Sequence, residues 1–318
     1  MYERTGASAD VLRIEEIDQP EPGPGEVRVR IEYSGVNPTD WKSRSGLTSR
    51  AIDGFQIPHH DGVGVIDAVG PGGDPGRVGQ RVWTWLAAAG RKWGTAAQWS
   101  VVPGRQAVAL PDGVSAELAA SLGVPAMTAH RCLFADGPVT GKTVLVAGGA
   151  GAVGHFAIEL AKWAGARVVA TVSGPRKAEL AAKAGADLVV NYREPGAADA
   201  IREFSQVDRI IELSLDANLD LDLAVIAPNS EIITYASTAA DPPLSVRACM
   251  NANVVLRFVL LYGVPPLALD RAAADITRAL TDGALSELPT HKYNLDDVVA
   301  AQDAVQAGAV GKVLVVTG

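Results

Sequence analysis

The sequence is poor in cysteine. Its 318 residues include only Cys132 and Cys249, too few for a disulfide framework and without the spacing of metal ligands. A chain without disulfides is typical of a reducing compartment. Its first residues lack the apolar segment of a secretory signal, and no apolar run is long and uncharged enough to cross a bilayer. We therefore expect a cytoplasmic protein.

Positive charge is also scarce. Lys and Arg number 28 against 36 Asp and Glu, so the formal net charge is -8 at pH 7. Such a surface repels a nucleic acid or an anionic membrane overall, and neither is expected as a partner. A hydrophobic fraction of 48% is enough to form the cores of two domains.

Two kinds of pattern divide the chain. Residues 1 to about 115 contain short alternating runs such as VRVRIEYSGV, separated by Gly and Pro turns, and this favours β-strands. From Thr143 onward, apolar strands alternate with helical stretches, as in βαβ units around a parallel sheet. We predict an α/β protein in which residues 117–255 form a doubly wound parallel-sheet domain. Residues 1–116 would form a β-rich domain, and residues 256–318 return to mixed strand and helix.

A glycine-rich turn follows the strand TVLVAG. Gly149, Gly151 and Gly154 form the G-x-G-x-x-G pattern at the start of a helix. The first glycine is expected to permit the tight turn, the second a close approach of backbone N–H groups to a pyrophosphate, and the third close helix–strand packing. The helix N-terminus would face the anion with free donors. The alternative is a βα turn that binds no ligand.

The next strand ends without the acidic residue that binds an NAD ribose. Ser173 stands there instead, and Pro175, Arg176 and Lys177 begin the following helix. Cations in a first turn oppose the helix dipole, so a bound anion is expected to compensate them. The 2′-phosphate of NADPH would do so, with Ser173 donating a hydrogen bond and Lys177 supplying charge. The alternative is a solvated basic helix face; we predict NADPH rather than NADH.

Four segments resemble a known family. They are GVNPTDWKSRSG, HHDGVGVIDAVG, TGKTVLVAGGAGAVG and the closing GKVLVVTG, and they are similar to the quinone oxidoreductase (zeta-crystallin-like) branch of the zinc-independent medium-chain dehydrogenase/reductase family. The resemblance covers essentially the whole chain. It implies a GroES-like catalytic domain, residues 1–116 and 256–318, interrupted by a Rossmann domain, residues 117–255. It also implies NADPH as hydride donor and a dimer or tetramer.

The resemblance also implies the residues of the cofactor site. The residues expected at the pyrophosphate are Ala150, Gly151, Ala152 and Val153, between Gly149 and Gly154. At the 2′-phosphate end we expect Ser173, Lys177 and Tyr192, together with Arg176. Asn218 would lie on the ribose side. The residues that would line the nicotinamide are Tyr235, Ala236, Ser237, Thr238, Phe258, Val259 and Leu260.

At the mouth of the substrate cleft the resemblance places Asn37, Trp41 and Lys42. We expect Asn37 to donate a hydrogen bond to the acceptor oxygen and Lys42 to contribute charge. Asp40 is either catalytic or, in the interpretation that we favour, a partner that holds the Asn37 loop. Trp41 is the best candidate to stack on a flat substrate. Thr48, where the family often has Tyr, would also lie in the cleft.

No metal is expected. Catalytic zinc needs three protein ligands, and zinc-containing relatives supply them as Cys, His and a further Cys. Asn37 stands at the first of these places, and the connector SLGVPAMTAH contains no Cys. His60 remains, and we expect it to form a polar wall of the cleft or to be structural.

The chemistry follows from the missing Lewis acid. Reducing an isolated ketone builds negative charge on one oxygen, which a metal or an acid must stabilise. Quinones and α,β-unsaturated carbonyls delocalise that charge themselves. The predicted function is NADPH-dependent quinone reduction by direct hydride transfer. The alternatives are reduction of an enone, enal or acrylyl thioester, and an NADPH-binding sensor without turnover.

The segment NVVLRFVLL, residues 253–261, is apolar and β-branched at the end of the predicted parallel sheet. It could form an exposed edge that pairs with the same strand of a second copy across a two-fold axis. The alternative is a buried strand within one chain. We predict a homodimer.

Overall fold

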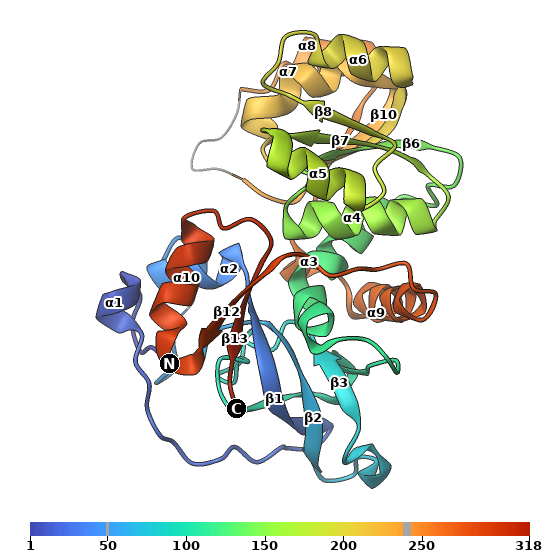
Figure 1. Cartoon of the computed structure of the whole chain (residues 1–318). Coiled ribbons are helices and arrows are strands. Elements are labelled where there is room, and N and C mark those ends of the chain that lie inside the picture. The colour runs from blue at the N-terminus through green and yellow to red at the C-terminus, as the bar shows by residue number, and fades with distance from the viewer. Residues whose placement is uncertain (49–50, 238–242) are drawn as a thin grey trace. The chain divides into compact units, whose positions relative to one another are not determined.

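The computed structural model describes residues 1–48, 51–237 and 243–318. The chain divides into two compact units, Met1–Val124 with Glu287–Gly318 and Pro125–Ser286 (Figure 1). The expected boundaries, after 116 and 255, differ from these. The boundary expected after 116 lies after Val124, because the beginning of α3 (Ala116–Phe134) belongs to the first unit. The boundary expected after 255 lies after Ser286, because β11 (Val255–Phe258) pairs with the sheet of the second unit.

The first unit is built on a mainly antiparallel sheet with strand order β12-β13-β1-β2-β3-β5, and β4 also pairs with β1. The long strand β1 alternates buried and exposed side chains over much of its length, because one face packs on the core. The strands are β1 (Glu26–Val36), β2 (Asp61–Val69), β3 (Arg81–Thr84), β4 (Trp99–Pro103), β5 (Ala107–Ala109), β12 (Thr290–Asn294) and β13 (Lys312–Val316).

Short helices complete the first unit. Helix α2 begins after Asn37 with Pro38 at its first position and ends at Gly46, whose φ of 93° is left-handed, as helix starts and stops require. The elements are α1 (Ser8–Val11), α2 (Pro38–Ser45), α10 (Val298–Gln306) and the 3-10 turns η1 (Pro75–Arg77), η2 (Gly104–Gln106) and η4 (Leu295–Asp297). Arg44 of α2 donates to Gln302 of α10 at 3.1 Å, which ties the two helices together.

The second unit is a parallel sheet with strand order β11-β10-β9-β6-β7-β8. This is the doubly wound Rossmann order, so the predicted fold class is confirmed. Strand β6 is wholly buried, which explains why its residues after Thr143 are all apolar. The strands are β6 (Thr143–Ala147), β7 (Arg167–Val172), β8 (Leu188–Asn191), β9 (Val207–Glu212), β10 (Ile226–Thr234) and β11.

Helices cover both faces of the parallel sheet. Figure 1 shows α4 and α5 on one side of it and α6, α7 and α8 on the other. The helices of this unit are the remainder of α3, then α4 (Ala152–Trp163), α5 (Pro175–Lys183), α6 (Ala197–Phe204), α7 (Leu215–Val225), α8 (Val246–Ala252), the turn η3 (Leu261–Gly263) and α9 (Pro266–Thr281). The strand order reverses between β6 and β9, and ligands of such sheets bind at the carboxyl ends of the strands beside this point.

Among the helices in the described part of the chain, none combines the length and the apolar character that a membrane span requires.

Candidate functional site

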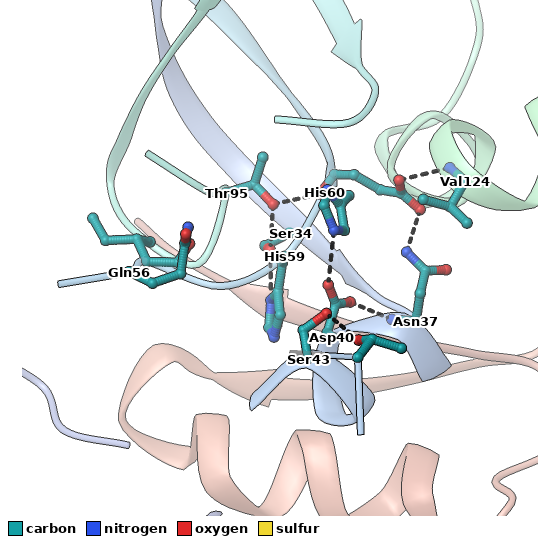
Figure 2. Close-up of polar contacts among 12 residues, drawn as sticks. Ser34, Asn37, Asp40, Ser43, Gln56, His59, His60, Thr95 and Val124 are labelled. Atoms are coloured by element: carbon teal, nitrogen blue, oxygen red, sulfur yellow. Dashed lines mark hydrogen bonds and ion pairs between the residues drawn. The ribbon is translucent and has the colours of Figure 1, made fainter. Parts of the chain in front are cut away.

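A buried polar cluster surrounds the start of α2 in the first unit. The Asn37 backbone N–H donates to Asp40 Oδ2 at 2.7 Å, so the Asp40 carboxylate closes the first turn of the helix (Figure 2). Complete burial raises the pKa of Asp40 well above its usual range, although the hydrogen bond from Asn37 opposes the shift. This contact gives Asp40 the loop-holding position that the sequence interpretation favours.

The side-chain amide of Asn37 lies between two charged groups. Its Nδ2 donates to Asp61 Oδ2 at 2.7 Å, and Lys312 Nζ donates to its Oδ1 at 2.8 Å. Lys312 Nζ also lies 3.1 Å from Asp61 Oδ2. All three residues are buried, with at most 2% of their surface exposed. The cluster that we call the Asn37 ring consists of these three side chains.

Asp61 joins this ring to α3. Its Oδ1 accepts the backbone N–H of Val124 at 2.7 Å (Figure 2). A Cβ on Gly123 would lie 2.1 Å from the same oxygen, so glycine is required there. Burial raises the pKa of Asp61, while the charge of Lys312 and the hydrogen bonds from Asn37 and Val124 lower it.

The adjacent histidines have different surroundings. His59 has a left-handed φ of 77°, and its Nδ1 lies 2.9 Å from Ser34 Oγ, which in turn lies 2.7 Å from Thr95 Oγ1 (Figure 2). Burial lowers the pKa of His59 to about 3, so it is a neutral core residue. His60 faces the Asn37 loop instead, with Nε2 4.0 Å from Asp40 Oδ1.

Lys42 is not part of this cluster. Its Nζ lies 5.9 Å from the centroid of the Trp41 ring, on a half-buried face of α2. Thr48 is exposed, and its hydroxyl lies 3.0 Å from that of Ser43. The lysine that contacts Asn37 is Lys312, which the sequence analysis did not single out. The sequence offered a signal for Lys312: it opens a strand whose following residues are wholly apolar.

The glycine turn after β6 differs from expectation in one detail. Gly148, outside the motif, has the left-handed φ of 67°, so it and not Gly149 makes the tight turn. Gly149 instead packs closely, since a Cβ there would lie 2.8 Å from the Cβ of Ala170. Gly154 permits the helix to approach the turn, because its Cβ would lie 2.3 Å from the Gly148 oxygen.

The start of α4 can accept an anion. Gly151 is its N-cap, and the first N–H groups of a helix have no intrahelical acceptor. No side chain caps this helix, so these donors also lack a side-chain acceptor. The residues of this turn that were expected at the pyrophosphate are Ala150, Gly151, Ala152 and Val153. The uncapped donors and the small side chains fit a pyrophosphate.

The start of α5 brings a hydroxyl and a cation together. Lys177 Nζ lies 3.0 Å from Ser173 Oγ, and a Cβ at the intervening Gly174 would meet nothing within 4 Å. Arg176 is exposed. The Tyr192 N–H donates to the Val172 carbonyl at 3.1 Å, so Tyr192 follows β8 beside the end of β7. These groups fit an exposed phosphate.

Asn218 is already engaged. Its Nδ2 donates to Glu212 Oε1 at 3.0 Å, and the same oxygen accepts the backbone N–H groups of Leu213, at 2.7 Å, and Ser214. Glu212 therefore holds the turn that leads into α7, and Asn218 of that helix supports it. Burial raises the pKa of Glu212 against these hydrogen bonds.

The residues expected at the nicotinamide follow β10 and β11. The Tyr235 N–H donates to the Glu212 carbonyl at 3.2 Å, and burial raises the pKa of its phenol. Ala236 is half-buried, Ser237 is exposed, and Thr238 lies outside the described residues. Val259 N–H donates to Thr234 at 2.9 Å. The exposed fractions are 72% for Phe258 and 69% for Leu260, so both are open in the single chain.

Comparison with known proteins identifies two domains. The alcohol dehydrogenase GroES-like domain matches residues 23–112, and the zinc-binding dehydrogenase domain matches residues 152–275. Human quinone oxidoreductase is 27% identical over 312 residues, which cover 96% of this chain and 93% of the human protein.

Solved structures have the same fold. A mycobacterial protein in complex with NADPH is 29% identical, with a TM-score of 0.86 over 99% of this chain and 98% of that one. The Escherichia coli quinone oxidoreductase in complex with NADPH has a TM-score of 0.84 at 22% identity, over 99% of this chain and 98% of that one.

The second matching domain is named a zinc-binding dehydrogenase domain, and catalytic zinc needs three protein ligands. Within residues 1–48, 51–237 and 243–318, no group of three or more His, Cys, Asp or Glu side chains is placed to hold a metal ion. In the Asn37 ring an ammonium already contacts both Asn37 and Asp61 and would repel a metal cation. The residues present do not fit zinc.

The domain matches, the relatives and the strand order all lead to one assignment. The two domains match in sequence order, and the solved relatives cover nearly the full length of the chain. The chain belongs to the zinc-independent quinone oxidoreductase branch of the medium-chain dehydrogenase/reductase family.

Proposed function

We propose that this oxidoreductase uses NADPH to reduce quinones. The observation that carries the proposal is the contact between Ser173 and Lys177, which offers a hydroxyl and a cation where an NAD site has a carboxylate. The mycobacterial relative solved with NADPH supports the cofactor, and the human quinone oxidoreductase supports the acceptor class.

The second unit would bind the nucleotide through two helix starts. The first turn of α4 would receive the pyrophosphate with backbone N–H groups, and Ser173 with Lys177 would bind the 2′-phosphate. When bound, NADPH supplies a hydride. The residues of the chain contribute binding and orientation, which are sufficient for an acceptor that is already reactive.

The first unit would hold the acceptor. Asn37 would donate a hydrogen bond to the acceptor oxygen, while Asp40 holds the loop from which it extends. A quinone or an enone spreads the incoming charge over its conjugated system, so a hydrogen bond replaces a metal at the oxygen. We further propose that Trp41 stacks on the ring and that His60 forms a polar wall.

A screen of acceptors tests this function. The protein is expected to oxidise NADPH with benzoquinone or phenanthrenequinone and not with cyclohexanone, because only the conjugated acceptors delocalise the charge. Absorbance of NADPH at steady state measures the rates. Faster turnover of cyclohexenone than of either quinone would make the protein an enone reductase. Equal turnover of cyclohexanone would contradict the proposal, and NADPH binding without any turnover would indicate a sensor.

We also propose that the protein forms a homodimer through β11. This strand is an edge of the parallel sheet. Exposed apolar side chains lie on the strand, directly after it and on the preceding helix α8: Val255 and Phe258, Leu260, and Val246 and Met250. An apolar edge of this kind suits the same strand of a second copy.

Phe258→Asp is expected to convert the dimer to a monomer, because it places like charges on both copies of the edge. Light scattering after size-exclusion chromatography measures the mass. Leu267→Asp is the matched control, since Leu267 is 83% exposed and belongs to α9, not to the strand. A native protein that is monomeric at micromolar concentration, or equal dissociation by both variants, would contradict the interface.

A further inference from the structure

The Asn37 amide has one hydrogen that the protein does not use. The backbone N–H of Asn37 donates to Asp40, and its carbonyl accepts the Asp40 N–H at 3.0 Å. Its Nδ2 carries two hydrogens, and Asp61 accepts one of them. Among the described residues the second hydrogen has no acceptor.

The geometry of the Asn37 ring identifies which hydrogen remains. Lys312 Nζ contacts both Asn37 Oδ1 and Asp61 Oδ2, at 2.8 and 3.1 Å, and Nδ2 closes the ring to the same Asp61 oxygen at 2.7 Å. A closed ring through Oδ1 and Nδ2 requires that the Nδ2 hydrogen donated to Asp61 be the one on the same side of the amide as Oδ1. The unused hydrogen therefore points away from Lys312 and Asp61.

The two charges also prevent the amide from turning over. A flipped amide would set its oxygen against the Asp61 carboxylate and its NH₂ group against the Lys312 ammonium, and both contacts would be repulsive. The opposite charges compensate each other, which a buried pair requires. Asn37 is thus held in one orientation by chemistry and not only by packing.

The fold makes room for this lysine. Lys312 is the first residue of β13, and Gly35 of β1 lies beside its stem, so that a Cβ at Gly35 would lie 3.0 Å from Lys312 Cε. The preceding Gly311 has a φ of 102°, which turns the chain into the strand. Two glycines therefore allow the ammonium to reach Asn37.

We propose that Lys312 and Asp61 are positioning residues, which aim the free N–H of Asn37 at the acceptor oxygen where negative charge develops. The inference rests on the proposed reduction of conjugated carbonyls. The ammonium on Oδ1 also draws electron density from the amide and strengthens its N–H as a donor. The ring thus performs at the oxygen the role that a Lewis acid has in other carbonyl reductions.

The test compares kinetics and binding in paired variants. Lys312→Met alone would leave Asp61 charged and buried, so the main variant is Asp61→Asn/Lys312→Met, which removes both charges together. We expect kcat with benzoquinone to fall about ten- to hundredfold, as expected for a misplaced catalytic group, with the Kd for NADPH unchanged. Lys292→Met, on the neighbouring strand β12, is the control and should leave kcat unchanged.

A double-mutant cycle separates positioning from a structural role. If Lys312 and Asp61 act through Asn37, adding Asp61→Asn/Lys312→Met to Asn37→Ala should slow the enzyme no further than Asn37→Ala alone. Additive losses would overturn the proposal, as would a paired variant with lower thermal stability but normal kcat. An unmodified chain that turns over no conjugated acceptor would overturn the proposed function and this assignment together. Normal turnover by the paired variant would overturn only the assignment.

Discussion

Replacing Lys177 with alanine is expected to weaken NADPH binding about ten- to hundredfold, because a hydrogen bond to a charged group contributes roughly 1.5–3 kcal/mol. NADH binding should be unchanged, since NADH has no phosphate for Lys177 to contact. The Ser173 hydroxyl, 3.0 Å from Lys177 Nζ, would remain as the second donor. Isothermal titration with each nucleotide measures both dissociation constants.

Lys183→Ala is the matched control for this change. Lys183 lies exposed in the last turn of the same helix, where its charge favours the helix dipole and is remote from the first turn. It should alter neither dissociation constant. If Lys177→Ala weakened NADH and NADPH equally, Lys177 would contact a part of the nucleotide that both share, and the 2′-phosphate assignment would be wrong.

The fold was accessible to sequence analysis because its signals are local. The strand before Gly149 and the helix after it are adjacent in the chain, and the alternation of strands and helices specifies a parallel sheet. The motif predicts the tight turn at Gly149, whereas Gly148 makes it, because only backbone dihedral angles distinguish two consecutive glycines. The domain boundary at 286 depends on the pairing of β11 with β10. The apolar segment that forms β11 does not show from its sequence which strand it pairs with.

The candidate site was only partly accessible, because its residues meet across the chain. Asn37 and Lys312 are 275 residues apart in sequence and meet where β13 pairs with β1. Lys42, which is close to Asn37 in the sequence, lies in the same helix as Asp40 but outside the Asn37 ring. Likewise the pair His59-His60 does not show which ring faces Asp40, since the left-handed backbone at His59 decides it.

A second buried acid lies in the second unit beside Glu212. Asp222 of α7 is 1% exposed, and its Oδ2 has no hydrogen-bond partner among the described residues. Burial, and then the charge of Glu212, raise the pKa of Asp222 to about 9. Glu212 is committed as an acceptor to the start of α7, so the proton of this pair resides on Asp222.

This proton makes stability depend on pH. An unfolded Asp has a pKa of about 3.9, so between about pH 4 and pH 9 the folded chain holds a proton that the unfolded chain has lost. The free energy of unfolding is therefore highest below the unfolded pKa and decreases as pH rises toward the folded pKa, by at most about 1.4 kcal/mol per pH unit. Above pH 9 this contribution becomes constant.

Asp222→Asn should therefore stabilise the protein at alkaline pH, because the amide mimics the protonated acid and cannot ionise. We expect its thermal unfolding midpoint to exceed that of the unmodified chain by several degrees at pH 8.5, and by much less at pH 5. Asp220→Asn, at an exposed position of the same helix, should give no such pH-dependent difference. A lower midpoint for Asp222→Asn at pH 8.5 would show that Asp222 is ionised in the folded protein and that a positive partner, not a proton, compensates its charge.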